Sequence, residues 1–238
     1  MSDGLRLGLI IDEINIFEKW GIRVKDRKYL KPNKKKILEY LPHSSKTLDF
    51  SEIYGGPSYE ERSLQYTLNL IGTQPNRIAA EFLDTEFTNF IMAKPQFKLI
   101  DELFDGYYFL AEVRTGTDFS PLFSYGELTV VFNAYPFRIK VAKEGSPYWD
   151  DYSILDYYQE VEFTVSGTKQ IELMNNGSEI VYPKVNCSSP MTINKGNTQY
   201  SFPSGSSTSL DFSLSTGMNN LTVTGNGKID FEFHKELI

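Results

Sequence analysis

The side chains best suited to catalysis are few in this sequence and stand far apart. The chain has two histidines, His43 and His234, and a single cysteine, Cys187. A Ser–His–Asp arrangement needs a histidine beside a serine and a carboxylate. His43 precedes two serines, but it also follows Pro42, and this combination is typical of a turn. Cys187 has no histidine near it in the sequence, so we expect a small, half-buried thiol there.

Acidic residues occur in four doublets: Asp12-Glu13, Glu60-Glu61, Asp101-Glu102 and Asp150-Asp151. A glycosidase needs two carboxylates that converge on a sugar across ~5–9.5 Å. Adjacent residues on a strand point to opposite faces, so a doublet does not form such a pair by itself.

Metal ligands are equally sparse. Histidine and cysteine never occur at the C-x-x-C or H-x-x-x-H spacing of metal sites. Asp12 could bind calcium together with Asp26 or Asp49, but no segment resembles the D-x-[DN]-x-[DN]-G loop. The sequence therefore predicts no catalytic residue, no cofactor-binding or metal site, and a protein that is not an enzyme.

Four aromatic residues form a noticeable group near the middle of the chain: Tyr148, Trp149, Tyr157 and Tyr158. In a sugar-binding domain such rings stack on a pyranose. In an assembly they are interface anchors, since Trp and Tyr are enriched among residues that dominate binding energy. Filling of a core is the third interpretation, and the sequence leaves all three open.

Composition and charge narrow the class of protein. The chain has 238 residues, of which 40% are apolar and 14% aromatic, enough to build one large or two medium cores. Its net charge of −7 argues against a nucleic-acid ligand. Residues 1–50 carry 11 basic and 7 acidic residues, and the remainder carries 13 and 24. This asymmetry suits head-to-tail contacts between identical subunits.

A basic cluster, made of Lys31, Lys34, Lys35 and Lys36, lies in the first fifty residues. No aromatic residue interleaves these lysines, as stacking on nucleic-acid bases would require. We expect a solvated loop or a sheet edge protected by lysine. The first residues lack a basic stretch followed by a long apolar run, and no window approaches the ~18 apolar residues of a membrane span. With one cysteine and no signal peptide, we expect synthesis in a reducing cytoplasm.

Periodic patterns predict a mainly β protein. Residues 64–70, 107–113 and 128–135 alternate as strands with one buried face. In the last of these, Leu128, Val130, Phe132 and Ala134 share a face, and Pro136 ends the pairing. Residues 77–93 have apolar side chains at helical spacing, at Ala79, Leu83, Phe87, Phe90 and Ile91, and Lys94-Pro95 stops this helix.

After residue 137 the composition changes. Residues 138–156 contain Gly145 and Pro147 and are typical of a connection. Short strands separated by Ser, Thr, Asn and Gly follow, at 161–165, 171–174, 191–193, 210–214, 221–224 and 229–233. Strands of this length with regular turn signals indicate a second domain, a β-sandwich.

Six short segments share their order and spacing with one known family. They read T-L-D-F-S-E-I-Y-G-G-P-S-Y-E-E-R at 47–62, D-G-Y-Y-F-L-A-E-V at 105–113, L-T-V-V-F-N-A-Y-P-F at 128–137, N-N-G at 175–177, V-Y-P-K at 181–184 and L-T-V-T-G-N-G-K-I-D-F at 221–231. In these segments the chain resembles the distal tail proteins of long-tailed bacteriophages, over nearly its full length.

This resemblance implies an N-terminal β-sandwich or split-barrel-like domain with one helix at 1–137, a connecting segment at 138–156 and a galectin-like β-sandwich at 157–238. It implies a structural virion protein, a baseplate hub whose six copies form a ring between the tail tube and the tip or receptor-binding proteins. The particle would assemble in the bacterial cytoplasm, with no cofactor and no membrane partner. Two rival functions remain: a carbohydrate-binding module that contacts cell-wall polysaccharide, and a cell-wall hydrolase.

Overall fold

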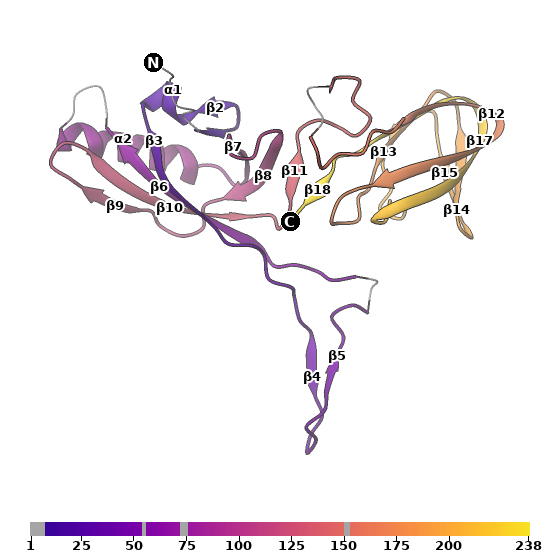
Figure 1. Cartoon of the computed structure of the whole chain (residues 1–238), viewed down its shortest axis with the longest axis horizontal. Coiled ribbons are helices and arrows are strands. Elements are labelled where there is room, and N and C mark those ends of the chain that lie inside the picture. Colours follow the sequence, from indigo (N-terminus) through magenta and orange to yellow (C-terminus); the bar gives the residue numbers. More distant parts are fainter. Residues whose placement is uncertain (1–7, 54–55, 72–75, 150–152) are drawn as a thin grey trace. The chain divides into compact units, whose positions relative to one another are not determined.

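A computed structural model describes residues 8–53, 56–71, 76–149 and 153–238 of the chain. It divides into two compact units: unit 1 is residues 1–138 with 238, and unit 2 is residues 139–237. Both consist mainly of antiparallel strands (Figure 1), so the prediction of a mainly β protein is confirmed. Neither helix among the described residues is long and apolar enough to cross a membrane.

The strands of unit 1 lie in the order β2-β1-β7-β8-β10-β6-β3. The strands of this order are β1 (Leu9–Ile11), β2 (Ile14–Asn15), β3 (Arg23–Tyr29), β6 (Arg62–Leu70), β7 (Phe97–Asp101), β8 (Tyr107–Glu112) and β10 (Gly126–Ala134). A further strand, β9 (Asp118–Pro121), pairs with β10 outside this order. Strand β10 pairs with β6 along its whole length. Its other edge pairs with β9 at residues 126–129 and with β8 only at residues 133–134. The sheet therefore opens between β8 and β9, as a split barrel does.

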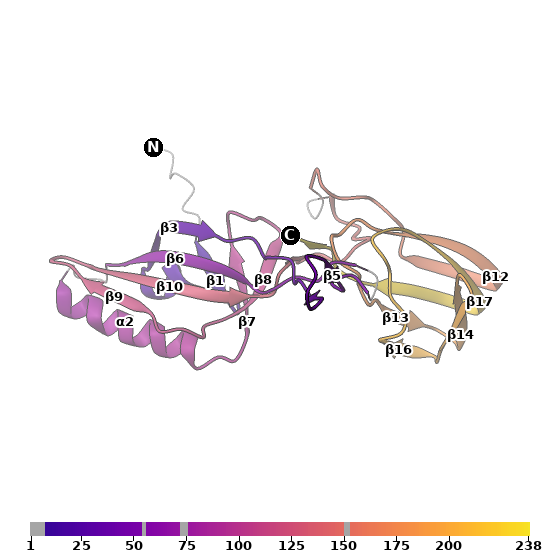
Figure 2. The same ribbon diagram turned by 90° about the horizontal axis from the view of Figure 1, so that it is seen from below.

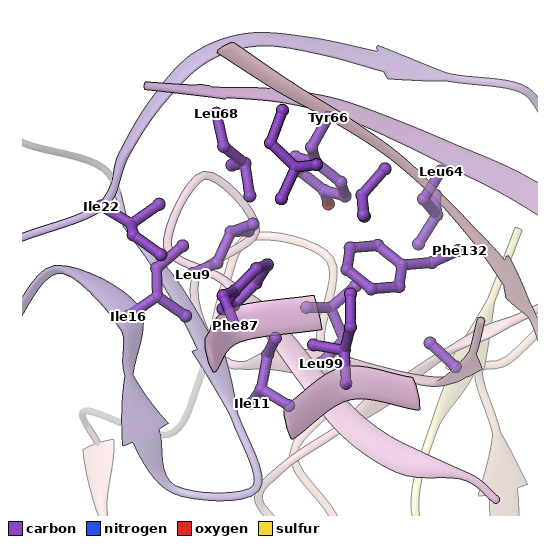
Figure 3. Packing of buried hydrophobic residues seen from close by; sticks show 14 of the residues in the cluster. Leu9, Ile11, Ile16, Ile22, Leu64, Tyr66, Leu68, Phe87, Leu99 and Phe132 are labelled. Carbon is purple, nitrogen blue, oxygen red and sulfur yellow. The ribbon is translucent and has the colours of Figure 1, made fainter. Parts of the chain in front are cut away.

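The ladder of β6 and β10 confirms the alternation read from the sequence. Leu128, Val130, Phe132 and Ala134 are buried, and the residues between them are half-buried. The ring of Phe132 makes edge contacts with Tyr66 and Phe97, with 5.7 Å between ring centroids in both cases. Figure 3 shows Phe132 and Tyr66 converging with side chains of β1, β7 and α2, among them Leu9, Leu99 and Phe87, in one core. The ladder ends before Pro136, which lacks the N–H that pairing needs.

The predicted helix is α2 (Arg77–Met92). Its first turn is capped by Asn76, whose Oδ1 accepts a hydrogen bond from Ala79 N at 2.8 Å. Phe87 and Ile91 are buried as predicted, but Ala80 is the buried alanine and Ala79 is only partly covered. Each helical residue turns by about 100°, so a shift of one position turns Ala79 toward the edge of the packed face.

The sequence did not predict the short helix α1 (Ile16–Trp20). Asn15 caps it, accepting from Phe17 N at 2.9 Å, and Gly21 ends it in the left-handed conformation with φ of 69°. Five residues carry too little periodicity to be distinguished from a strand and turn. The periodicity of the sequence therefore does not reveal this helix.

Unit 2 is built around two long strands, β12 (Glu162–Asn175) and β17 (Gly217–Glu232), which pair over 14 positions. The far edge of β17 carries β14 beside its first half and β13 beside its last residues. The remaining strands are β11 (Arg138–Lys140), β13 (Lys184–Cys187), β14 (Met191–Lys195), β15 (Thr198–Phe202), β16 (Gly205–Ser207) and β18 (Glu236–Leu237). A core that includes Val185, Phe212 and Phe231 lies inside.

Glycines explain why the predicted strands at 161–165 and 171–174 are one strand, and likewise those at 221–224 and 229–233. Gly167 lies opposite Gly225, and the pairing of the two long strands continues without interruption through this point. Gly225 and Gly227 have φ of 153° and 135°, which other residues rarely adopt. A Cβ on Gly225 would lie 2.8 Å from Met191 Cγ. The predicted strand at 210–214 was also wrong, because only an isolated bridge from Leu214 to Val181 forms there.

Candidate functional site

Between β3 and β6 the chain leaves the sheet of unit 1 as a two-stranded arm (Figure 1). We define the arm as residues 30–53 and 56–61. Its base continues the β3–β6 pairing, with a hydrogen bond from Leu30 N to Ser63 O at 3.0 Å. Its end is a hairpin of β4 (Leu38–Tyr40) and β5 (Thr47–Asp49), which pair with each other and form a separate sheet. Because an isolated two-stranded ribbon is only marginally stable in water, the arm needs a partner.

The arm is rich in exposed apolar side chains. Among its described residues, eight large ones are exposed: Leu30, Ile37, Leu38, Tyr40, Leu41, Leu48, Phe50 and Ile53. Tyr40 exposes 74% of its surface. Neighbours such as Ile37 and Leu38 point to opposite faces of a strand, so both faces of the ribbon carry apolar groups. A gathering of this kind on a soluble protein marks an interaction surface.

The basic cluster lies on the same arm. Lys31, Lys34, Lys35 and Lys36 are all exposed, which confirms the predicted solvated edge. Lys36 Nζ lies 2.8 Å from Asp49 Oδ2 on the returning strand. This hydrogen bond and a second one from Ser51 hold the pKa of Asp49 well below its usual range. The lysines therefore support the hairpin and leave its apolar side chains available for contact.

Unit 1 has a second exposed apolar surface, which we call the helix surface: Ile78 and Phe82 of α2 together with Phe123 of the β9–β10 turn. Ile78 and Phe82 lie one helical turn apart, and Phe123 is 97% exposed. Ala80 Cβ lies 3.2 Å from the position that a Cβ on Gly126 would take, so this end of α2 packs at the start of β10. Figure 2 shows α2 running along β9 and β10.

The two histidines and the cysteine are not brought together. His43 lies at the turn of the arm, between β4 and β5, with φ of 57°, which confirms the predicted turn. His234 belongs to unit 2, where its Nδ1 lies 3.0 Å from Lys140 O. Cys187 is buried, and burial raises the pKa of its thiol above the ordinary value, so the thiolate is disfavoured at neutral pH.

The acidic doublets have structural roles where they are described. Asp12 and Glu13 form a tight turn with positive φ, and Asp12 Oδ1 accepts from Lys98 N at 3.0 Å while Oδ2 pairs with Lys94. Glu61 pairs with Arg114. Asp150-Asp151 lies outside the described residues. Glu60 and Glu102 have partners of their own, because Glu60 Oε2 accepts from Asn33 Nδ2 at 3.4 Å and Glu102 Oε2 accepts from Gly8 N at 2.5 Å.

Asp101 is a buried charge that the sequence did not reveal. Its carboxylate accepts hydrogen bonds from Arg27 Nε (3.1 Å), Tyr29 OH (2.5 Å), Tyr66 OH (3.1 Å) and Leu103 N (3.0 Å). Desolvation and then the nearby carboxylate raise the pKa of both tyrosines, so both phenols stay neutral and donate. Arg27 and Tyr29 end β3 just before the arm, so this network anchors the base of the arm.

Unit 2 contains a second buried network. Lys140 Nζ and Lys235 Nζ each lie 2.9 Å from the carboxylate of Asp156, and all three side chains are almost fully buried. Burial by itself would raise the pKa of Asp156, but hydrogen bonds from Lys140, from Ser153 N and from Lys235 outweigh it and hold that pKa at about 2. Glu144 lies nearby, and burial raises the pKa of its carboxyl group.

The four aromatic residues near the middle of the chain are exposed. Tyr148, Trp149, Tyr157 and Tyr158 all lie on the surface of unit 2, and Trp149 is 86% exposed. The interpretation as core filling was therefore wrong. Stacking on a sugar and contact with a partner protein both remain compatible with this exposure.

Comparison with known proteins decides the fold. The crystal structure of the Dit (gp 19.1) protein of phage SPP1 aligns with 98% of this chain and 99% of its own, at a TM-score of 0.67 and 11% identity. The chain has the fold of SPP1 Dit. That protein is described as a paradigm of the hub adsorption apparatus in phages that infect Gram-positive bacteria. No protein-family model and no curated protein matches the sequence.

The likeness to SPP1 Dit extends over both units. The resemblance drawn from the motifs is thus confirmed as a likeness of fold. A chain of the phage p2 baseplate in its activated conformation with strontium aligns over 98% of both chains at 12% identity. Its TM-score of 0.41 is too low to establish a common fold.

The arm was not predicted as a site from the sequence. The available signal was a run of apolar residues on both faces of two short segments, at 37–41 and 48–53, with lysines beside them. Such a pattern fits neither a strand with one buried face nor a loop. It is typical of a ribbon that becomes buried only in an assembly.

Proposed function

We propose that the chain is a structural protein of a phage tail tip: a hub whose six copies form a ring that joins the tail tube to baseplate or receptor-binding proteins. The likeness to SPP1 Dit over the whole chain carries this proposal, because it includes both units and not one common β-sandwich. The hub would act without catalysis and without a cofactor. It would assemble in the bacterial cytoplasm and function in the virion.

The proposal divides the chain by role. Residues 1–137 would form the ring, residues 138–156 would connect, and the sandwich of residues 157–238 would hold the proteins of the tip. Each unit has its own hydrophobic core, as such a division requires.

Ring formation has a physical basis in unit 1. A closed ring uses a heterologous contact, in which two different surfaces of the same chain meet on neighbouring copies. The arm and the helix surface are two such surfaces, and both expose large apolar side chains. The contrast between a basic first fifth and an acidic remainder would orient neighbouring copies.

Light scattering coupled to size-exclusion chromatography of the full chain tests the ring. We expect a species of six chain masses, each 27.3 kDa, and six-fold rings in negative-stain images. A chain that stays monomeric at every concentration, and gives no rings in images, would contradict the proposal.

Direct binding of cell-wall polysaccharide is a second candidate function for unit 2. One observation favours it beyond the exposed aromatics. The outer face of β12, β17 and β14 is hollowed, and four of the residues that line the hollow, Gln170, Asn194, Asn220 and Thr222, are uncharged and polar.

A further inference from the structure

Two rows of uncharged polar side chains cross three neighbouring strands of unit 2. Paired residues on β12, β17 and β14 make the rows: Thr168, Thr224 and Thr192 in the first, and Gln170, Thr222 and Asn194 in the second. The hydroxyls of Thr168 and Thr224 lie 3.4 Å apart, so the members of a row are in contact distance. Side chains on one face of a sheet alternate with those on the other. Val223 of β17 and Ile193 of β14 lie between the rows, and Ile171 follows Gln170 on β12. These three residues are buried, so both rows point away from the core, whereas Lys169, between the rows on β12, is exposed.

The face is also concave. A hollow of about 510 Å³ lies over the second row and is lined by Gln170, Glu172, Asn194, Asn220 and Thr222. This volume falls within the range of small-ligand sites. Glu172 lies opposite Asn220 and is the one charged residue of the lining.

The polar groups in this hollow have unused hydrogen-bonding capacity. No side-chain hydrogen bond joins Gln170, Asn194, Asn220 or Thr222 to another residue in the described ranges. Each amide offers two donors and an acceptor, and each hydroxyl offers one donor and two acceptors. Fixed arrays of this kind match the vicinal hydroxyl groups of a saccharide, each of which donates and accepts.

We propose that this hollow, the amide site, binds a neutral oligosaccharide of hexose or N-acetylhexosamine units. The proposal deepens the second candidate function of unit 2 and does not depend on the ring. Gln170 and Asn194 lie on either side of Thr222 and would hold adjacent hydroxyls of one sugar unit.

The charge of the lining selects against other ligands. A polyphosphate chain, such as a teichoic acid, would meet the carboxylate of Glu172 and no cation in this lining. A protein interface of usual affinity needs buried apolar anchors, and the side chains of this lining that reach the surface are polar. A neutral polyol brings no charge that the carboxylate of Glu172 would repel, and its hydroxyls donate to that carboxylate and pair with the amides.

Isothermal titration of the full chain tests the amide site. The probes are oligosaccharides of glucose, of galactose and of N-acetylglucosamine, with poly(glycerol phosphate) as the anionic comparison. We expect saturable binding to a neutral probe and none to the polyphosphate.

The substitution Gln170→Ala or Asn194→Ala should weaken this binding about tenfold, since each removes hydrogen bonds to the sugar. Thr208→Ala, an exposed threonine outside the hollow, is the control and should bind as the unchanged chain does.

The possible results of this titration distinguish a failure of the amide site from a failure of the second candidate function. Neutral sugar binding that survives both amide substitutions would place the ligand elsewhere on unit 2, for instance on the exposed aromatics, and would overturn the amide site while keeping the second candidate function. Absence of binding to every neutral probe, or binding to poly(glycerol phosphate) alone, would overturn both. The melting temperatures of the variants should equal that of the unchanged chain, because the substituted side chains lie on the surface.

Discussion

At the scale of single residues, each unit buries an aspartate, but the groups that surround the two carboxylates differ. In unit 1, Asp101 collects one guanidinium, two phenols and a backbone N–H. In unit 2, Asp156 sits between two lysines. Neither arrangement could be predicted from the sequence, because the side-chain donors come from segments 16 to 79 residues away. Only an acidic residue at an inward position of an apolar strand, as Asp101 is in F-K-L-I-D, gives a hint.

Asp156→Asn should destabilise unit 2. The substitution leaves Lys140 and Lys235 buried beside a neutral amide, and breaking a buried ion pair from one side costs about 3–5 kcal/mol. Urea unfolding followed by the NMR signals of unit 2 measures the free energy. Asp211→Asn changes an exposed carboxylate of the same unit and serves as the control. An equal effect of the two substitutions would show that the network adds nothing to stability.

The same carboxylate predicts a pH dependence. Its pKa is about 2 in the folded chain and about 3.9 in an unfolded one, so the folded state favours the ionised form. The contribution of Asp156 is therefore complete above pH of about 5 and is lost as the pH falls toward 2. We expect the difference in unfolding free energy between the unchanged chain and the Asp156→Asn variant to shrink over this range. A difference that stays constant from neutral to acidic pH would contradict the assigned role.

Phe132→Ala should be among the most damaging single substitutions in unit 1. Its ring is fully buried and contacts Tyr66 and Phe97, and such truncations cost about 3–5 kcal/mol. Thr129→Ala, on the half-buried face of the same strand, should cost much less. Chemical unfolding of the two variants measures the contrast. A melting temperature unchanged by Phe132→Ala would mean that this face of β10 is not in the core.

At the scale of elements, predictions succeeded where one buried face imposed a regular period. Strands β6 and β10 alternate along nine residues each, and α2 repeats its apolar face over four turns. The predictions failed at glycines inside the two long strands of unit 2. Gly167 and Gly225 were interpreted as turn residues, but with their positive φ they lie inside continuous strands. The arm was missed because it has no core of its own to impose a period.

The arm provides the sharpest test of assembly. Ile37→Ser combined with Tyr40→Ser removes two exposed apolar side chains and should weaken association about tenfold or more, as loss of anchor residues does. Both residues are exposed in the single chain, so the melting temperature at low concentration should not change. Glu39→Gln, on the same strand, is the matched control and should assemble normally. Light scattering across a range of concentrations measures the effect. Unchanged association of the double variant would exclude the arm as the contact between copies.

At the scale of the whole molecule, the exposed surfaces of the two units differ in their chemistry. Unit 1 exposes apolar side chains on the arm and the helix surface, which suits permanent contacts between copies. Unit 2 exposes aromatic rings and a polar hollow with a single charged residue, which suits contacts made by an assembled particle with another molecule. Motifs spread over the full sequence indicated the fold. The proposed division into an assembling and a contacting unit rests on the exposure of individual side chains.

This division predicts that the units behave differently when separated. Unit 1 has its own core, which includes Leu64, Phe87 and Phe132, and it retains both apolar surfaces, so a fragment of residues 1–138 should fold and still associate. A fragment of residues 139–238 also has its own core and should fold, but it should remain monomeric at concentrations where the first fragment forms oligomers. Light scattering of each fragment, and of an equal mixture, measures this. Oligomers of residues 139–238 beside a monomeric first fragment would reverse the assignment, because the sandwich would then build the ring and the arm would need a different partner.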